Sequence, residues 1–421
     1  MSNQAPSDFV ARVTAAAAAV RTVLQPTPLQ FNAFLSDRHG ANIYLKREDL
    51  TPVRSYKLRG AFNFFRKTVS EAGPDATFAC ASAGKHAQGF AYACKHFGVS
   101  GTVFMPVTRP QQKIQKTRVF GGEHVEIELE GDIFDQCYAA AMDFAAETGA
   151  RFVPPFDHGD IIEGQATVAL ELLEQAGQSV DVLIIPVGGD GLAAGVTQVI
   201  RALSPKTRIL YVEPQGAPSL RQSLESKERV RLDRVDNFVD GAAVAQIGEL
   251  NFGVLKDLDP NSVLLIKEDS LCETIIEMLN IEGIVLEPAG ALEIDALRYR
   301  DPDELKGKTV VCLTSGGNFD FERLPEVKER ALRASGRNKY YILRLPQRPG
   351  ALREFLDLLG PDDGIARFEY LKKSARNFGS ILIGVESPDS ANFAVLNEKM
   401  DAAGFQFQDI TDDDLVASFI V

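Results

Sequence analysis

Residues 182–203 read VLIIPVGGDGLAAGVTQVIRAL, which is an apolar run, a glycine cluster and a helix-period stretch in that order. The run Val182 to Val187 has no polar side chain, which is typical of a strand in a parallel sheet that helices cover on both faces. Gly188 and Gly189 follow this strand, and Ala193 to Leu203 is predicted to be a helix. Ligands of such folds bind beyond the carboxyl ends of the strands, where loops lead into helix N-termini. The stretch therefore predicts an α/β fold with a ligand site at the glycines.

The same alternation extends in both directions, from about residue 42 to residue 320. Apolar runs alternate with amphipathic or small-residue stretches, as open parallel sheets between helices require. The other predicted strands are Asn42 to Lys46, Thr77 to Ala81, Thr102 to Met105, Val125 to Ile127, Ile209 to Val212, Val263 to Ile266 and Val310 to Thr314. The other predicted helices are Leu58 to Val69, Gln88 to Phe97 and Phe134 to Glu147.

A different pattern begins after Arg337. Its stretches follow the order βαββαβ, which is typical of a ferredoxin-like α+β unit of about 80 residues. The predicted strands are Lys339 to Leu345, Ile365 to Leu371, Ser380 to Val385 and Gly404 to Asp409, and the predicted helices are Gly350 to Leu359 and Ala391 to Ala403. We therefore expect two domains, residues 1–330 and residues 338–421.

The composition excludes several classes of protein. The chain has 421 residues, of which 45% are hydrophobic and 24% charged, so it can bury an ordinary core. Its 45 Lys+Arg and 58 Asp+Glu give a net charge of −13. This charge argues against binding to nucleic acid or to an anionic membrane, because phosphates attract positive surfaces. No apolar run approaches the roughly 20 residues of a membrane helix, and the N-terminus lacks the basic cluster of a signal peptide.

The use of cysteine and histidine indicates the cytoplasm and no bound metal. The five cysteines include no C-x-x-C pair, so we expect buried, reduced thiols and no disulfide framework. No two of the five histidines have the spacing of metal ligands. We therefore expect a cytoplasmic protein without a metal site.

One lysine in the stretch KREDLTPVRSYKLRGA, residues 46–61, has a setting that suits catalysis. Lys57 opens a predicted helix after a loop that contains proline. The positive end of the helix dipole disfavours the ammonium form of such a lysine. A neutral lysine amine is a nucleophile that forms imines with carbonyl compounds. A lone lysine at a helix start is more often an ordinary surface residue, so the interpretation depends on the other segments.

Three further segments end predicted strands with small residues or a hydroxyl group. In CASAGKHAQG, residues 80–89, small residues leave backbone N–H groups free to hold an anion such as a carboxylate. The glycines of residues 188–191 are suited to a phosphate for the same reason. The segment TSGGN, residues 314–318, places a serine hydroxyl at a strand end. Taken singly, each segment is as often a tight structural turn.

Taken together and in this order, the four segments resemble the fold-type II pyridoxal-phosphate enzymes, whose fold is similar to that of the tryptophan synthase β-subunit. Within them the chain is most similar to the biosynthetic threonine dehydratases (threonine ammonia-lyases). The resemblance covers residues 20–320 and rests on KREDL, SYKLRGA, ASAGKHAQG, the glycine loop, EPAG at residues 287–290, and SGGN. LPQRPGAL at residues 345–352 and FEYL at residues 368–371 resemble the single ACT-like regulatory domain of the short dehydratases.

The resemblance implies roles for individual residues. Lys57 is expected to bind the cofactor pyridoxal 5'-phosphate covalently and then to remove the substrate α-proton. Tyr56 is expected to pack against the cofactor ring, and Ser315 to hydrogen-bond the ring nitrogen. The groups expected to bind the phosphate are the backbone N–H groups of Gly188, Gly189, Gly191 and Leu192. The residues expected to bracket the substrate carboxylate are Ser82, Ala83, Gly84 and His86.

The implied activity is an α,β-elimination that converts L-threonine into 2-oxobutanoate and ammonia in isoleucine biosynthesis. A neutral hydroxyl at Ser315 favours loss of the β-hydroxyl group over reprotonation of the α-carbon. Ala83 stands where the racemases of the family have a serine base. Feedback control by isoleucine or valine at the C-terminal domain, and a homodimer or homotetramer, are also implied. Serine or another β-hydroxy amino acid stays an alternative substrate, because a pocket discriminates one methyl group by only about 1–3 kcal/mol.

Two positions depart from the family pattern at the cofactor. The family has asparagine at position 85 and glycine at position 190, whereas this chain has Lys85 and Asp190. A carboxylate at about 4 Å from a phosphate charge costs on the order of 4 kcal/mol at an effective dielectric near 20. In one hypothesis the two side chains pair across the pocket in the cofactor's place, which would make the chain a cofactor-impaired or cofactor-free amino-acid-binding homologue. In a second, Lys85 attracts the phosphate or the ring oxygen and offsets Asp190, which leaves a working but weaker site. In a third, the sequence is engineered and the two residues have no adaptive meaning.

Overall fold

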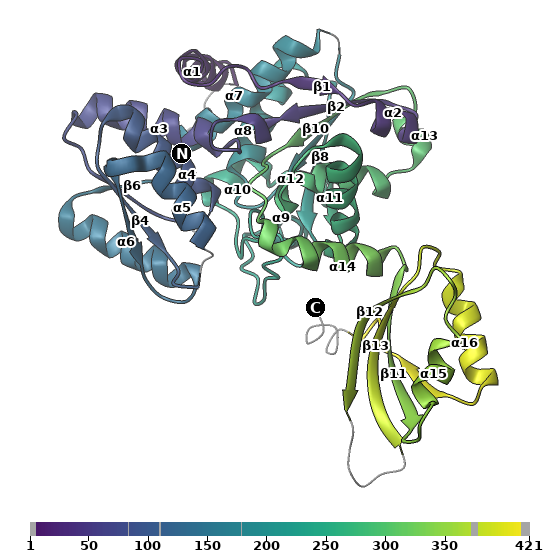
Figure 1. The fold of residues 1–421 in the computed structure, drawn as a ribbon. Coiled ribbons are helices and arrows are strands. Elements are labelled where there is room, and N and C mark those ends of the chain that lie inside the picture. Colours follow the sequence, from purple (N-terminus) through teal and green to yellow (C-terminus); the bar gives the residue numbers. More distant parts are fainter. Residues whose placement is uncertain (1–5, 83, 109–110, 178, 372–377, 414–421) are drawn as a thin grey trace. The chain divides into compact units, whose positions relative to one another are not determined.

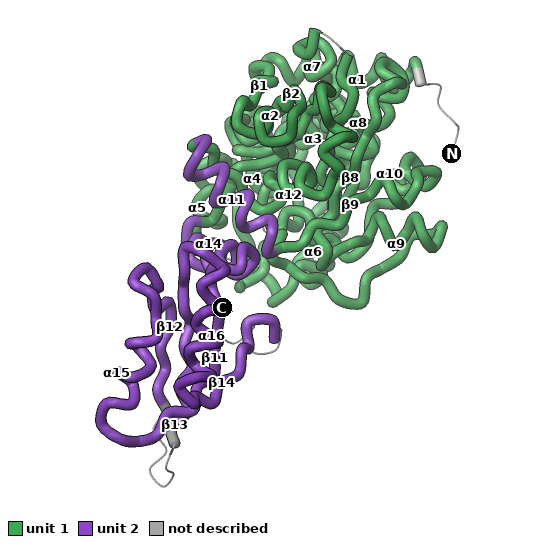
Figure 2. The backbone as a smooth tube through the Cα atoms, turned by 90° about the vertical axis from the view of Figure 1, so that its right-hand side faces the viewer, with its two compact units in different colours: residues 1–268, 283–320 green, residues 269–282, 321–421 purple. Residues whose placement is uncertain are grey.

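The computed structural model describes residues 6–82, 84–108, 111–177, 179–371 and 378–413. The chain forms two compact units, which Figure 2 distinguishes by colour. Unit 1 comprises Met1–Glu268 and Gly283–Asp320, and unit 2 comprises Asp269–Glu282 and Phe321–Val421.

The central sheet of unit 1 has six strands in the order β1-β2-β10-β7-β8-β9 (Figure 1). Their bounds are β1 Leu29–Phe31, β2 Asn42–Arg47, β7 Val182–Pro186, β8 Arg208–Pro214, β9 Val263–Ile266 and β10 Thr309–Thr314. All neighbours pair in parallel except β1, which pairs antiparallel to β2. The five parallel strands confirm the predicted ones. Strand β1 was not predicted, because three residues at a sheet edge show no hydrophobic period.

A second, smaller sheet of unit 1 has four parallel strands in the order β5-β4-β3-β6. Their bounds are β3 Phe78–Ala81, β4 Gly101–Met105, β5 Val125–Leu129 and β6 Arg151–Phe152. Phe65 stacks on Phe78 of β3 at 4.2 Å between ring centres, and Phe90 meets Phe65 edge-on at 5.4 Å. The two sheets confirm the predicted architecture of open parallel sheets.

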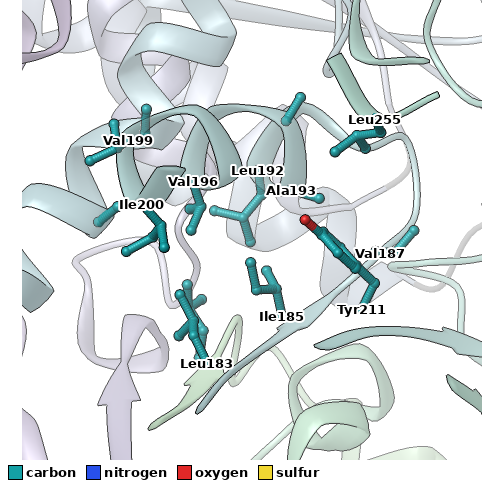
Figure 3. Close-up of a cluster of buried hydrophobic side chains, with 14 of the residues drawn as sticks. Leu183, Ile185, Val187, Leu192, Ala193, Val196, Val199, Ile200, Tyr211 and Leu255 are labelled. Atoms are coloured by element: carbon teal, nitrogen blue, oxygen red, sulfur yellow. The ribbon is translucent and has the colours of Figure 1, made fainter. Parts of the chain in front are cut away.

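Helices surround both sheets of unit 1. Their bounds are α1 Pro6–Val20, α2 Ala33–His39, α3 Lys57–Ala72, α4 Lys85–Phe97, α5 Gln111–Gly121, α6 Phe134–Thr148, α7 Gly159–Ala176, α8 Gly191–Leu203, α9 Ser219–Ser226, α10 Glu249–Leu255, α12 Pro288–Asp295 and α13 Pro302–Leu305. Figure 3 shows Val196 and Ile200 of α8 above Leu183 and Ile185 of β7, in one buried cluster. This packing fixes the first turn of α8 and with it the loop that leads from β7.

Unit 2 contains an antiparallel sheet in the order β12-β13-β11-β14. The strands are β11 Asn338–Pro346, β12 Gly364–Leu371, β13 Phe378–Glu386 and β14 Gln406–Asp409, and the helices α15 Ala351–Leu356 and α16 Asn392–Ala402 complete the predicted βαββαβ order. Tyr341, Phe355, Ile383 and Phe393 lie in its buried core. Helix α14 (Leu324–Ala334) and almost all of α11 (Glu268–Glu282) are also part of this unit.

Two sequence-based expectations concern thiols and membranes. All five cysteines are buried thiols, as their apolar neighbours predicted. Within the described parts of the chain, no helix is long and apolar enough to cross a bilayer.

Candidate active site

Lys57 is the first residue of α3, and its amine contacts a distant loop. Nζ donates a hydrogen bond to the Pro155 carbonyl oxygen over 2.7 Å. It lies 5.4 Å from the ring centre of Tyr56 and 6.0 Å from that of Phe156. Burial of the amine, together with the positive charge of Lys85, lowers the pKa of Lys57 to about 7. A large share of the amine is therefore neutral at neutral pH. The sequence predicted a neutral amine from the helix dipole, whereas burial is the main cause.

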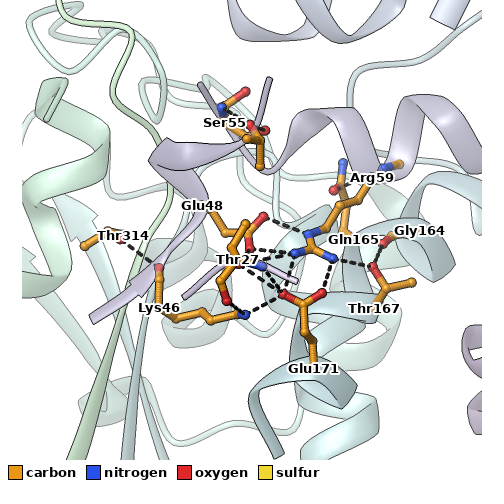
Figure 4. Close-up of polar contacts among 12 residues, drawn as sticks. Thr27, Lys46, Glu48, Ser55, Arg59, Gly164, Gln165, Thr167, Glu171 and Thr314 are labelled. Carbon is orange, nitrogen blue, oxygen red and sulfur yellow. Dashed lines mark hydrogen bonds and ion pairs between the residues drawn. The ribbon is translucent and has the colours of Figure 1, made fainter. Parts of the chain in front are cut away.

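A buried network of charges holds the start of α3 (Figure 4). Arg59, two residues after Lys57, is 1% exposed and donates to the Glu48 carboxylate over 2.7 and 2.8 Å. Its guanidinium also pairs with Glu171 of α7 at 3.0 Å, and Lys46 of β2 pairs with the same carboxylate at 2.5 Å. Burial favours the neutral acid, yet the two cations lower the pKa of Glu171. The network joins β2, α3 and α7, so it fixes the position from which the Lys57 side chain extends.

The glycine loop, residues 188–191, lies directly against an aromatic ring. A Cβ at Gly189 would be 2.1 Å from the Phe156 ring, and one at Gly191 would be 2.8 Å from the Phe156 carbonyl oxygen. Only glycine allows this approach of the backbone. Because Phe156 follows the residue that accepts the Lys57 hydrogen bond, the loop and the lysine amine lie on either side of the Pro155–Phe156 segment, and we call this region the pocket.

The same loop leaves backbone N–H groups without helical acceptors. The first hydrogen bond of α8 runs from Ala194 N to Asp190 O over 2.8 Å. The N–H groups of Gly191 and Leu192 therefore precede the helical ladder, and the helix dipole makes this end attractive to an anion. The Leu192 side chain is buried in the core cluster. At Gly188 a Cβ would lie 3.0 Å from the Ala242 Cα, so this glycine also accommodates close backbone packing.

The loop before α4 is organised by a serine hydroxyl. Ser82 Oγ accepts hydrogen bonds from the backbone N–H groups of Gly84 and Ala87, over 3.2 and 3.1 Å. Because Oγ only accepts in these two bonds, its own proton stays available as a donor. Ala83, the position expected to exclude a racemase, lies outside the described residues.

His86 is buried and neutral. Its Nε2 lies 2.9 Å from the Val153 carbonyl oxygen, which can only accept, so Nε2 carries the proton. Burial lowers the pKa of His86 to about 3, and the nearby charge of Lys57 acts in the same direction. With the proton on Nε2, Nδ1 is an acceptor, so only the backbone N–H of His86 is able to donate to an anion.

Ser315 lies at the end of β10, next to the residues before α3. Its Oγ donates to the Ala289 carbonyl oxygen over 3.0 Å, and its own carbonyl accepts from Tyr56 N over 3.2 Å. An isolated bridge between Ser55 and Gly316 holds the same two segments together. Burial raises the pKa of the Tyr56 phenol to about 12, so this ring is uncharged.

Lys85 pairs with Glu287 and not with Asp190. The distance from Lys85 Nζ to Glu287 Oε1 is 2.7 Å, and both side chains are buried. Burial alone would lower the pKa of Lys85, but the Glu287 carboxylate raises it, so the lysine is charged. A Cβ at Gly241 would be 2.5 Å from Lys85 Nζ, which shows that the lysine fills the space next to this glycine. The hypothesis of a pair between Lys85 and Asp190 is therefore wrong.

Asp190 is held in a different state from the one assumed in the sequence analysis. Its carboxyl group is 4% exposed, and neither oxygen has a hydrogen-bond partner among the residues that the structure describes. Burial, with a second contribution from the Glu213 charge, raises the pKa of Asp190 well above its usual range. A neutral carboxyl group lacks the charge on which the estimated repulsion of a phosphate depended.

The structure thus brings the described residues of all four segments into one region of unit 1. Sequence reasoning gave no role to Pro155, which accepts the Lys57 hydrogen bond across 98 residues of chain, or to Phe156, whose ring centre lies 6.0 Å from the amine. No local motif marks either residue. Glu287 did lie in the recognised EPAG segment, but its ion pair with Lys85 depends on the fold.

Two family models match the chain. The model described as "Pyridoxal-phosphate dependent enzyme" matches residues 20–316, and the model described as "C-terminal regulatory domain of Threonine dehydratase" matches residues 329–420. The first match contains the complete pocket, and the second contains the described strands of the antiparallel sheet in unit 2.

Several full-length proteins are similar to this chain. The protein named L-threonine dehydratase biosynthetic IlvA of Halalkalibacterium halodurans is 41% identical over 403 residues, which are 96% of this chain and 96% of that protein. The protein of the same name from Bacillus subtilis is 44% identical over 397 residues, 94% of this chain and 93% of that protein. The solved structure of the processed form of threonine deaminase isoform 2 from Solanum lycopersicum is 36% identical, with a TM-score of 0.73, and the match covers 79% of this chain and 94% of that one.

Proposed function

Because the chain belongs to the family of pyridoxal-phosphate dependent enzymes and, within it, to the biosynthetic L-threonine dehydratases, we propose that it converts L-threonine into 2-oxobutanoate and ammonia. In this α,β-elimination the substrate loses its α-proton and its β-hydroxyl group. The released enamine then takes up water and yields the keto acid and ammonia, so that the overall reaction conserves the atoms of threonine.

The pocket fits a phosphorylated aromatic aldehyde. An amine with a pKa of about 7 lies next to a glycine loop at the N-terminus of α8, a helix of 13 residues. The glycines let the backbone approach a ligand, and the helix end favours an anion. Burial favours the neutral form of the Asp190 carboxyl group, which reduces its repulsion of a phosphate.

On this fit, the residues that hold the cofactor are those that the sequence pattern indicated. Lys57 Nζ would bind it covalently, Tyr56 would pack against its ring, and the Ser315 hydroxyl, which donates to Ala289 in this structure, would hydrogen-bond the ring nitrogen. The backbone N–H groups of Gly188, Gly189, Gly191 and Leu192 would bind the phosphate. Pyridoxal phosphate, when bound, withdraws electrons from the substrate α-carbon.

The proton chemistry belongs to side chains of this chain. Lys57 Nζ, partly neutral at neutral pH, accepts the α-proton of the substrate. The Ser82 hydroxyl, whose proton is available, donates to the substrate carboxylate, together with backbone N–H groups of the loop of Ala83, Gly84 and His86. Because His86 has its proton on Nε2 and directed at Val153, its ring orients the loop and does not donate to the substrate.

The observation that carries the proposal is the Lys57 amine, with its low pKa, in the same pocket as the glycine loop. The test is the visible spectrum of the purified protein with pyridoxal phosphate, followed by borohydride reduction and mass mapping. We expect an imine band, an adduct on Lys57, and formation of 2-oxobutanoate from L-threonine. The variant K57A should lose all three, while K67A, a lysine of the same helix α3, should keep them. The absence of this band at saturating cofactor would refute the proposed enzymatic function. It would favour the interpretation of the chain as a cofactor-free amino-acid-binding homologue.

The C-terminal part of the chain has a proposed regulatory role. We propose that residues 338–421 bind isoleucine or valine and control a catalytic domain of residues 1–330. The match to a regulatory domain of threonine dehydratase supports this assignment. We also propose a cytoplasmic homodimer or homotetramer. Inhibition of 2-oxobutanoate formation by added isoleucine or valine, and sedimentation of the full chain, test these two statements.

A further inference from the structure

Asp190 is the only residue of the glycine loop that has a side chain. Its backbone has a φ of +70°, in the left-handed region that aspartate tolerates better than most residues. It is also the residue that precedes the first turn of α8, and its side chain does not cap that helix. The residue is 4% exposed, and both carboxyl oxygens are buried without a hydrogen-bond partner in the described part of the chain. Its hydrogen-bonding capacity is therefore available to a ligand.

The groups that influence this carboxyl group electrostatically come from three parts of unit 1. From β8, Glu213 adds a like charge and Tyr211 senses the charge of Asp190. The phenol of Tyr56, before α3, senses it as well. Within its own loop, the Gly188 backbone N–H lowers the pKa of this carboxyl group, but burial and Glu213 outweigh it. The carboxyl group is therefore coupled electrostatically to β8 and to Tyr56, the residue before Lys57.

Nearby cations have other partners. Lys85 is paired with Glu287 at 2.7 Å, and Lys57 donates to a carbonyl oxygen at 2.7 Å. In these contacts neither lysine is paired with the Asp190 carboxyl group. Burial next to Glu213 therefore favours the protonated acid, which is a hydrogen-bond donor.

We propose that Asp190 binds the cofactor phosphate as a neutral acid, whose O–H donates a hydrogen bond to a phosphate oxygen beside the N–H groups at the start of α8. This inference rests on the proposed function, because it presupposes a phosphate-bearing cofactor in the pocket. No proton leaves the protein in this contact. If Asp190 ionises, the donor is lost and a negative charge faces the phosphate.

The affinity for pyridoxal phosphate then depends on the protonation of one carboxyl group. Above the pKa of Asp190, the dissociation constant should rise about tenfold for each pH unit, because only the protonated protein binds well. Pyridoxal, which lacks the phosphate, should not show this dependence. Asparagine keeps the shape of the side chain and an N–H donor but does not ionise, so D190N is the matched variant.

The experiment measures dissociation constants of pyridoxal phosphate for the cofactor-free full chain, for D190N and for D190G, from mildly acidic to alkaline pH. At each pH we divide the dissociation constant of the wild type by that of D190N. Lys57 and the phosphate titrate in both proteins, so their effects cancel in this ratio. We expect this ratio to be level at acidic pH and to rise about tenfold per unit above the Asp190 pKa. With pyridoxal as the probe it should stay level throughout. D190G should bind pyridoxal phosphate more weakly than wild type at acidic pH, because it lacks the donor.

A level ratio over the whole range overturns the inference. So does a wild type that binds more weakly than both variants at every pH, since that result means an ionised carboxylate that repels the phosphate. Thermal melts of the three proteins check that the variants are folded. Failure of the inference is distinguishable from failure of the function: a borohydride-trapped adduct on Lys57 with a level ratio refutes only the role of Asp190, whereas no adduct in any of the three proteins refutes both.

Discussion

Replacement of Glu171 by glutamine tests whether buried charges position the catalytic helix α3. Glu171 accepts from Arg59 and Lys46, at 3.0 and 2.5 Å, and from Thr27 N at 2.7 Å. Glutamine has the same shape but no charge, so two buried cations would share the single carboxylate of Glu48. Breaking a buried ion pair by removal of one partner costs about 3–5 kcal/mol. We expect E171Q to lose this much free energy of unfolding in unit 1.

Helix α7, which contains Glu171, also provides the matched control. Glu174 is on α7 as well, and its side chain is 59% exposed in an ion pair with Arg21. An exposed pair contributes about 0–1 kcal/mol, so E174Q should remain close to wild type. Urea titrations followed by far-ultraviolet circular dichroism give the free energies of unfolding. Equal losses for E171Q and E174Q would refute the reasoning.

The difference in the free energy of unfolding between wild type and E171Q should depend on pH in one direction. The pKa of Glu171 in the folded protein is below the ordinary value of 4.5. Its carboxylate therefore adds stability above the pKa of the unfolded chain, and this contribution is lost as the pH falls through the folded-state pKa. The gap between wild type and E171Q should shrink on acidification. A gap that widens toward acidic pH would contradict the lowered pKa.

Two other substitutions test the pocket itself. G189A should raise the dissociation constant of pyridoxal phosphate at least about tenfold, since the new Cβ would lie 2.1 Å from an aromatic ring; G159A, where a Cβ meets nothing within 4 Å, should leave it unchanged in the same absorbance titration. K85Q removes a positive charge that lowers the pKa of Lys57, so the pH at which borohydride trapping of the imine reaches half its maximum should move upward. K67Q should not move this midpoint. An unchanged midpoint in K85Q would show that burial alone lowers the pKa of the Lys57 amine.

The fold was predictable where burial is continuous along the sequence. Val182 to Val187 and Val310 to Thr314 are apolar at nearly every position, and both became central strands. Strands β1 and β6 were missed because their three and two residues are shorter than any recognisable period. They pair because neighbouring strands present open edges, which is a property of the fold and not of their own sequence.

The candidate site was predictable only as far as local motifs reach. The motif around Lys57 identified the lysine, but its low pKa comes mainly from burial, which depends on segments such as the loop of Pro155. Arg59 and Glu48 were quoted within the same motif without a role, because charged residues near strand ends are normally solvated. Their ion pair at 2.7 Å, with both side chains at 1% exposure or less, required the three-dimensional packing of α3 and α7.

The two departures from the dehydratase pattern are each compensated within the pocket, and by different means. The positive charge of Lys85 is matched by the Glu287 carboxylate at 2.7 Å, whereas burial favours the neutral form of Asp190. Since His86 is neutral as well, these side chains add little net charge next to the start of α8, and the helix dipole stays the main attraction for an anion. The two compensations have no atom in common. Substitutions at 85 should therefore change the pKa of the Lys57 amine, and substitutions at 190 should change the binding of the phosphate.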